Sequence, residues 1–190
     1  MKIVLIRHLE SIANVKRCYA GWTDVNLTQE GLEKGIKLRK LYGNLKLDEF
    51  LFVSSSLSRA TKTMEILFPG KHYTKNDGLR ETNFGIFEMK TYDELKDQEE
   101  YQKWISGNFV SNQAPLGESY LMMQDRVLKS FKKLLSLNKD LVIVTHAGPI
   151  GVIMRYIMND INDNIFYYDC PNGLGYIIDY NKKDYTKISE

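Results

Sequence analysis

The sequence predicts an α/β fold, a three-layer sandwich in which a mostly parallel central sheet carries helices on both faces. Three short β-branched runs indicate the strands, because strands buried on both faces of a sheet read as continuous apolar segments. These runs lie at Lys2–Ile6, Glu49–Val53 and Leu141–Thr145. Helical segments separate them, and this alternation is typical of crossover connections within a single sheet.

The helices are indicated by apolar residues at helical spacing and by capping residues at their ends. Thr28 is a suitable N-cap for a helix that runs to about Tyr42, where Gly43-Asn44 provide a stop signal. A second helix is expected over Ser58–Phe68, before Pro69-Gly70. Further helices are expected over Thr91–Ile105, Glu118–Leu137 and Pro149–Met158, and shorter late strands over Phe166–Tyr168 and Leu174–Ile178.

The composition limits the number of domains and the class of partner. A chain of 190 residues, 43% of them hydrophobic, fits a single domain over residues 1–190. The formal net charge of +2 gives no global field that would recruit nucleic acid or an anionic membrane. The apolar run before Arg7 is too short for a signal peptide or a membrane span. We therefore expect a small-molecule ligand, with neither nucleic acid nor membrane as a partner.

The two cysteines and the late strands bear on cellular setting and assembly. Cys18 and Cys170 form no C-x-x-C pattern and no small disulfide framework, which favours a reducing, cytoplasmic location. An exposed late strand would offer an edge for pairing in a homodimer, an arrangement that the sequence leaves open.

Basic and imidazole side chains follow the predicted strands, where ligands bind in open α/β sheets. Arg7 and His8 end the first strand, Arg59 follows the second, and His146 follows the third. Guanidinium groups match phosphate oxygens, and a neutral imidazole can attack phosphorus, so this set predicts a phosphomonoester site. These two histidines and His72 lack the spacing of metal ligands, and we expect neither a metal nor an organic cofactor.

Five segments resemble, in the same order, the motif blocks of the histidine phosphatase superfamily, whose fold is phosphoglycerate mutase-like. Arg7-His8-Leu9-Glu10-Ser11 with Asn14 resembles its signature R-H-G-[EQ]-[ST]-x-x-N. The other four blocks are Gly21–Gly31 (G-x-x-D-x-x-L-T-x-x-G), Ser54–Thr63 (S-x-L-x-R-A-x-x-T), Leu79–Glu88, which resembles the segment with the catalytic acid, and Val144–Ile150, which resembles the block with the second histidine. Each block alone is a weak signal, but their shared order over nearly the whole chain is specific.

The resemblance implies a role for individual residues and makes the chain a phosphoric monoester hydrolase. His8 would be the nucleophile that is transiently phosphorylated, and Glu81 would be the proton donor. Arg7, Arg59 and His146 would complete the phosphate pocket. Further phosphate or substrate contacts are expected from Ser11, Asn14, Ala147, Tyr19, Gly21, Trp22 and Trp104.

Leu9 departs from the signature, which has glycine at this position. Glycine beside a nucleophile permits unusual dihedral angles or the close approach of a ligand. We expect the Leu9 side chain to turn away from the pocket and the enzyme to remain active. A non-catalytic module that binds a phosphate ligand is the alternative that this substitution leaves open.

Five aromatic residues between positions 19 and 104 have two interpretations. They would either wall a substrate pocket or, as aromatics at these spacings more often do, fill the core. The residues in question are Tyr19, Trp22, Phe84, Tyr101 and Trp104.

Two features favour a particular substrate. By resemblance, the glycolytic mutase branch carries a longer insertion between the positions of Glu81 and His146. The segments Tyr19–Asp24, Asn83–Leu95 and Pro115–Tyr120 resemble the α-ribazole phosphatases, which dephosphorylate α-ribazole 5′-phosphate in cobalamin biosynthesis. Substrate contacts are then expected around Gly117–Ser119 and Tyr101–Trp104. A broad-specificity phosphatase and a phosphoglycerate mutase remain alternatives, because variable loops determine selectivity on such a fold.

Overall fold

A six-stranded sheet forms the centre of the computed structural model, which describes residues 1–108, 110–161, 164 and 166–190. Its strand order is β3-β2-β4-β1-β5-β6. The first four of these strands run parallel, while β5 pairs antiparallel with β1 and with β6. The strands are Lys2–Arg7 (β1), Leu51–Ser55 (β2), Tyr73–Asn76 (β3), Leu141–Thr145 (β4), Gly175–Asp179 (β5) and Asp184–Lys187 (β6).

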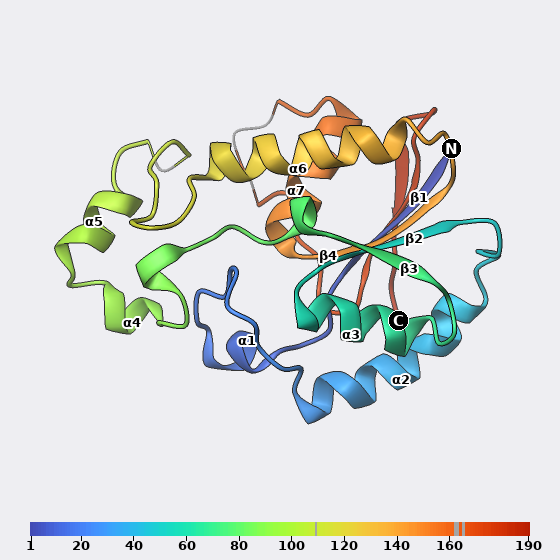
Figure 1. The fold of residues 1–190 in the computed structure, drawn as a ribbon, viewed down its shortest axis with the longest axis horizontal. Coiled ribbons are helices and arrows are strands. Elements are labelled where there is room, and N and C mark those ends of the chain that lie inside the picture. Colours follow the sequence, from blue (N-terminus) through green and yellow to red (C-terminus); the bar gives the residue numbers. More distant parts are fainter. Residues whose placement is uncertain (109, 162–163, 165) are drawn as a thin grey trace.

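Helices cover both faces of this sheet (Figure 1). One face carries α2 (Gln29–Gly43) and α3 (Ser58–Leu67), and the other carries α6 (Tyr120–Leu135) and α7 (Ala147–Met158). The predicted three-layer α/β fold with a mostly parallel sheet is therefore confirmed. In the part of the chain that the structure describes, no helix combines the length and the apolar character needed to cross a lipid bilayer.

Each face of the sheet has its own apolar core, because successive side chains of a strand point to opposite faces. In β1, Ile3 and Leu5 pack in the core beside α6 and α7. Val4 and Ile6 pack in the core beside α2 and α3. All four side chains are at least 98% buried, so β1 is fixed on both sides and holds the residues that follow it in place.

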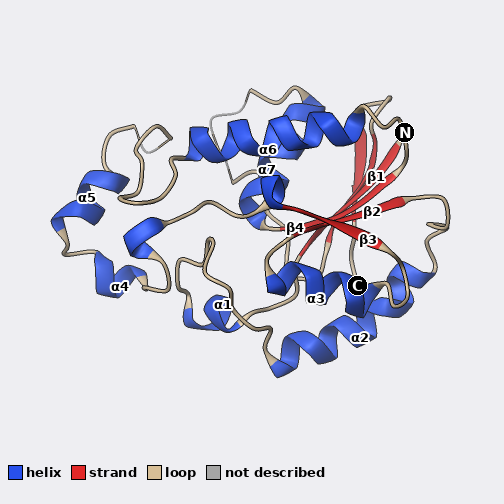
Figure 2. Cartoon of the chain, in the orientation of Figure 1, coloured by secondary structure: helices blue, strands red, loops and turns tan. Residues whose placement is uncertain are grey.

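A third group of short helices lies beyond the carboxyl ends of β1, β2 and β4 (Figure 2). It packs on a small aromatic core around Phe87, Tyr101 and Trp104. This group forms a wall beside the edge of the sheet where the predicted site residues emerge. Its elements are α4 (Tyr92–Leu95), α5 (Glu99–Ile105) and the 3₁₀ turn Gly85–Phe87 (η2). The helix α1 (Ile12–Lys16) and the 3₁₀ turn Asp77–Leu79 (η1) contribute no residue to this core, and Leu79 packs in the core beside α6 and α7.

Most of the predicted helices begin and end close to the positions that their capping residues indicate. Thr28 is the N-cap of α2, and its hydroxyl accepts a hydrogen bond from Gly31 N at 2.9 Å. The helix expected over Thr91–Ile105, however, is two helices, α4 and α5. Its apolar positions Leu95 and Tyr101 are separated by more than one turn of polar residues, so one continuous stripe does not form.

Two predicted strands also need correction. The strand expected over Glu49–Val53 is observed two residues later, at Leu51–Ser55. The strand expected over Phe166–Tyr168 is a turn. The side-chain oxygen of Asn164 accepts a hydrogen bond from Phe166 N at 3.0 Å, a local bond that competes with strand pairing.

Candidate active site

Two adjoining cavities open at the carboxyl edge of the sheet. We call them the polar cavity, of about 180 Å³, and the apolar cavity, of about 310 Å³. Four residues line both and so mark their shared boundary: Tyr19, Glu81, Phe84 and Ala147. The polar cavity is otherwise lined by Arg7, His8, Ser11, Asn14, Cys18, Ala20 and Arg59.

His8 lies at the end of β1 with its ring in one defined tautomer. Its Nδ1 is 2.6 Å from the carbonyl oxygen of Leu9. A carbonyl only accepts, so Nδ1 carries the proton and the lone pair is on Nε2. Burial, followed by the nearby Arg59 guanidinium, lowers the pKa of His8 to about 3. The imidazole is therefore neutral and nucleophilic at neutral pH.

His146 lies beside His8, with ring centroids 5.1 Å apart, and is fully buried. Its Nε2 is 2.8 Å from the hydroxyl of Ser55, at the end of β2. Within the described part of the chain, its Nδ1 is buried without a hydrogen-bond partner. Burial, with Arg59 next, holds the pKa of His146 well below its usual range. The structure thus brings this residue against His8 but behind the surface of the polar cavity.

Two arginines bring positive charge to the polar cavity. Arg7 donates from Nη1 to Asp169 at 3.1 Å and to the carbonyl of Cys170 at 2.7 Å. Arg59, on α3, is 1% exposed and donates three hydrogen bonds to backbone carbonyls. Among the described residues, the Nε atoms of both arginines are buried and unpaired. Both side chains are thus held in place while keeping donors that an oxyanion would satisfy.

Ser11 and Asn14 lie on the α1 side of the polar cavity, in a reciprocal cap. The Ser11 hydroxyl and backbone N–H donate to Asn14 Oδ1 at 2.8 and 2.9 Å. Because the amide oxygen is occupied in this way, the amide nitrogen is the group of Asn14 able to donate to a ligand. Nearby, the N-terminus of α7 begins at Ala147 and adds a positive dipole end to the same region.

Glu81 lies at the boundary of the two cavities, between η1 and η2. Its carboxylate accepts hydrogen bonds from Thr82 N at 2.9 Å and from Gly148 N at 3.1 Å. A Cβ at Gly148 would lie 2.3 Å from the Glu81 carboxylate, so the absence of a side chain allows this close approach. A carboxyl group here faces both the polar cavity, which His8 also lines, and the apolar cavity.

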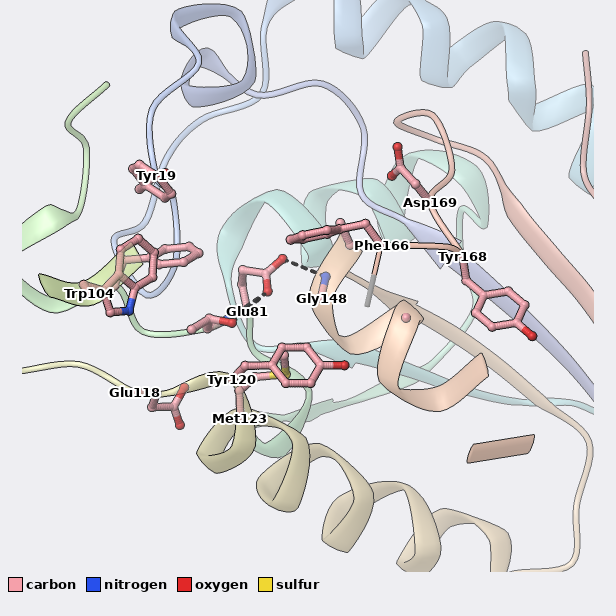
Figure 3. Close-up of a pocket in the computed structure, with 14 residues that line it drawn as sticks. Tyr19, Glu81, Trp104, Glu118, Tyr120, Met123, Gly148, Phe166, Tyr168 and Asp169 are labelled. Carbon is pink, nitrogen blue, oxygen red and sulfur yellow. Dashed lines mark hydrogen bonds between the residues drawn. The ribbon is translucent and has the colours of Figure 1, made fainter. Parts of the chain in front are cut away.

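The apolar cavity is built mainly from aromatic side chains (Figure 3). Tyr19 and Trp104 lie at one end, Tyr168 and Asp169 lie at the other, and the Glu81 carboxylate is between Phe166 and Tyr120. The described residues that line this cavity include no Lys, Arg or His. Its lining is Tyr19, Glu81, Thr82, Phe84, Trp104, Glu118, Tyr120, Met123, Ala147, Gly148, Gly151, Phe166, Tyr168 and Asp169.

Leu9 turns away from both cavities, as we expect from the sequence. Its side chain is fully buried in the core beside α2 and α3. Two glycines make room for it, since a Cβ at Gly35 or at Gly173 would lie 2.4 or 2.8 Å from its methyl groups. Leu9 is also absent from the described residues with positive φ, so this position does not require glycine here.

The structure does not bring every predicted contact residue into the cavities. Trp22 lies outside both, where its indole nitrogen donates to the carbonyl of Glu81 at 3.0 Å. Gly21 accepts a hydrogen bond from Arg59 through its carbonyl. Tyr101, one of the aromatics with two interpretations, is in the core, 1% exposed.

Several lining residues belong to no motif block. Met123 comes from α6, and Phe166, Tyr168 and Asp169 come from the loop after α7. Their apolar or acidic character is ordinary for a core or a surface, so the sequence carried no signal for them. Glu118 falls within a segment that we expected to contact substrate, Gly117–Ser119, and it does line the apolar cavity.

The arrangement suits transfer of a phosphoryl group. A neutral imidazole with a free lone pair, two arginines with unpaired donors, and a helix N-terminus surround one small polar space. Within the described residues, no group of three or more His, Cys, Asp or Glu side chains is placed to hold a metal ion. The neighbouring carboxyl group of Glu81 can exchange protons with a leaving group or with water.

Comparison with known proteins agrees with this chemistry. The chain is 26% identical over 190 residues to the adenosylcobalamin/alpha-ribazole phosphatase of Escherichia coli (strain K12), covering 96% of this chain and 92% of that protein. It is 28% identical over 163 residues to the probable phosphoglycerate mutase GpmB of Erwinia tasmaniensis, covering 83% and 75%. The crystal structure of the alpha-ribazole phosphatase from Shigella flexneri superposes with a TM-score of 0.85 at 25% identity, covering 99% and 95% of the two chains.

The model of the histidine phosphatase superfamily (branch 1) matches residues 3–189, nearly the whole chain. Together with the mutase-like fold and the histidine at the end of β1, this match leads to one conclusion. The chain belongs to the histidine phosphatase superfamily (branch 1), a family of phosphomonoester hydrolases.

Proposed function

We propose that this chain, as one domain over residues 1–190, hydrolyses a phosphomonoester through a phosphohistidine formed on His8. The observation that carries the proposal is the bond between Nδ1 of His8 and the carbonyl of Leu9. It leaves the lone pair on Nε2, within a cavity that Arg7 and Arg59 also line. A nucleophile with its lone pair available and its charge suppressed is what attack on a phosphate ester requires.

In the first half-reaction, the lone pair of His8 Nε2 forms a bond to phosphorus as the ester P–O bond breaks. Arg7 and Arg59 hold the phosphoryl oxygens and stabilise their charge, while His146 packs against the His8 ring behind the polar cavity. The leaving alkoxide takes the proton of the Glu81 carboxyl group and departs as an alcohol. The products of this step are phosphohistidine and the Glu81 carboxylate.

In the second half-reaction, the Glu81 carboxylate takes a proton from a water molecule as the water oxygen attacks phosphorus. The P–N bond breaks, and its electron pair returns to Nε2 of His8. Inorganic phosphate leaves, and both His8 and Glu81 regain their starting protonation states. The position of Glu81 at the boundary of the two cavities supports its use in both steps.

For the physiological substrate we propose α-ribazole 5′-phosphate, a nucleoside ester with an aromatic base, and a cytoplasmic role in cobalamin biosynthesis. The apolar cavity supports this choice, because its aromatic walls would accept a flat apolar group attached to a phosphate in the polar cavity. The likeness to the E. coli adenosylcobalamin/alpha-ribazole phosphatase points the same way.

Phosphoglycerate mutase activity is the second candidate, since relatives of that name are equally similar to the chain. The charges of the apolar cavity argue against it. Its ionisable carboxyl groups are Glu81, Glu118 and Asp169, and its described lining holds no basic residue. Two of these acids are already paired, Glu118 with Arg126 and Asp169 with Arg7, and the described lining offers the carboxylate of a phosphoglycerate no basic partner.

The test compares phosphate release from α-ribazole 5′-phosphate, 3-phosphoglycerate and an aryl phosphate. We expect a kcat/KM for the ribazole ester that exceeds the others by about 100-fold, from burial of its base in the apolar cavity. His8→Ala should abolish release, whereas His72→Ala, at an exposed histidine away from both cavities, should not. Equal rates on all three esters would replace the ribazole assignment with a broad-specificity phosphatase. Absence of any His8-dependent release would favour a phosphate-binding module instead.

A further inference from the structure

Glu88, after η2, accepts hydrogen bonds from four backbone N–H groups. Its Oε1 accepts from Trp22 N at 2.8 Å and from Phe84 N at 3.0 Å. Its Oε2 accepts from Thr23 N at 2.9 Å and from Gly21 N at 3.2 Å. No ion pair to Glu88 occurs among the described residues, so backbone amides are the immediate partners of this carboxylate.

The same loop, residues 20–23, presents its carbonyl groups to Arg59. The guanidinium donates to Gly21 O at 2.7 Å, to Ala20 O at 3.0 Å and to Thr23 O at 3.2 Å. The loop is therefore held from two sides, with its N–H groups on Glu88 and its carbonyls on Arg59. The packing is tight, because a Cβ at Gly21 would lie 2.3 Å from the Glu88 carboxylate.

These bonds fix the plane and rotation of the Arg59 guanidinium. A guanidinium group has five N–H donors in a rigid fork, and three are used by the loop. Its Nε is buried and, within the described chain, has no partner. Arg59 also lines the polar cavity, so the loop that binds part of the fork determines where the remaining donors point. Burial lowers the pKa of Arg59, while the carboxylates of Glu81, Asp24 and Glu88 act in the opposite direction.

We propose that Glu88 is a positioning residue that aligns Arg59 for phosphate by holding the loop of residues 20–23. It does not touch the phosphoryl group itself, because it lines neither cavity. The inference rests on the proposed phosphate site, in which Arg59 binds the phosphoryl oxygens. It extends that site to a carboxylate whose effect passes through three backbone amides of that loop.

Glu88→Gln tests the idea with little change in size. In either orientation, the glutamine replaces one acceptor oxygen by an NH2 group that faces two N–H donors, and two of the four bonds are lost. We expect the dissociation constant for inorganic phosphate, measured by titration calorimetry, to rise about tenfold. Glu94→Gln is the matched control: Glu94 also accepts a backbone N–H, that of Thr91 at 2.8 Å, but in an exposed helix cap, and phosphate affinity should not change.

A double-mutant cycle separates positioning from general damage to the fold. If Glu88 acts through Arg59, Glu88→Gln should weaken phosphate binding less than twofold when Arg59→Ala is already present. The same loss in both backgrounds, or no loss in the wild-type background, would overturn the inference. Should Glu88→Gln not fold, Glu88→Asp enters the same cycle under the same criteria. A wild-type protein that binds no phosphate would instead refute the proposed function.

Discussion

The polar cavity and the apolar cavity share a wall but are assembled differently. His8 and Arg59, in the polar cavity, are at least 95% buried and are held by hydrogen bonds to backbone carbonyls, His8 to that of Leu9 just after β1 and Arg59 to those of the loop of residues 20–23. The apolar cavity is closed by side chains from separate loops and helices, and one of them, Phe166, is 71% exposed. The difference indicates that the fold fixes the chemistry, while replaceable surface segments determine which ester is accepted.

The largest loss of activity is expected from substitution of Glu81, which lines both cavities. Glu81→Gln removes the proton donor while keeping the size of the side chain. For an alkyl ester we expect kcat/KM, which reports the phosphorylation of His8 and not the later hydrolysis of phosphohistidine, to fall about 10²- to 10³-fold, the usual contribution of a positioned acid. The loss should be below about tenfold for p-nitrophenyl phosphate, whose leaving group needs no proton. Steady-state kinetics on the two esters measures the contrast, and an equal loss on both would contradict the assigned role.

A smaller effect is expected from the apolar cavity alone. Tyr120→Ala removes an aromatic wall opposite Phe166 and should raise KM for α-ribazole 5′-phosphate about tenfold. The inhibition constant of inorganic phosphate should stay within twofold, because Tyr120 does not line the polar cavity. The neighbouring Leu121, 49% exposed and outside both cavities, provides the control variant Leu121→Ala. A parallel loss of phosphate affinity in Tyr120→Ala would show that the two cavities do not act separately.

The smallest effect concerns the pH dependence of stability. It arises from the two histidines that are buried at the polar cavity, and the apolar cavity has no histidine among its described lining residues. The pKa of His8 is about 3 in the folded protein and near 6.5 in the unfolded chain, so between these values the unfolded state binds more protons. The free energy of unfolding should therefore fall as pH decreases from about 6.5 towards 3, by about 1.4 kcal/mol per pH unit for this residue. His146, with its lowered pKa, acts in the same direction.

Urea unfolding at pH 6 and pH 5 measures this dependence. His8→Asn should reduce the slope of stability against pH by about one proton, whereas His72→Asn, at an exposed site, should leave it unchanged. A slope that is the same in His8→Asn and in the wild type would mean that His8 titrates normally in the folded protein.

The central strands and most helices could be predicted because their signals are local. The strand Leu141–Thr145 agrees at both ends, since it is apolar throughout and buried on both faces. The strands Tyr73–Asn76 and Asp184–Lys187 were missed because they lie at the two edges of the sheet and are short and polar. Edge strands pair on one side alone and need little apolar sequence.

The residues of the site divide in the same way, into those that a local sequence signal predicts and those that it does not. His8, Arg59 and Glu81 were predicted because they fall within motif blocks, and they do line one continuous site. Glu88 lies at the end of such a block, yet three of its four partners are backbone amides of a loop more than 60 positions away, and no side-chain pattern in the sequence indicates these hydrogen bonds. The walls of the apolar cavity depend likewise on which loops meet in space, information that a single sequence does not display.

The most direct test of the account is to trap the covalent intermediate on His8. The protein is mixed with excess aryl phosphate, quenched in alkali within one turnover, and digested for mass spectrometry. We predict an acid-labile, alkali-stable phosphate on the peptide that contains His8, absent in His8→Ala and still present in His72→Ala. Turnover of the ester with no phosphate on His8 at any quench time, or with phosphate on another residue, would contradict the mechanism.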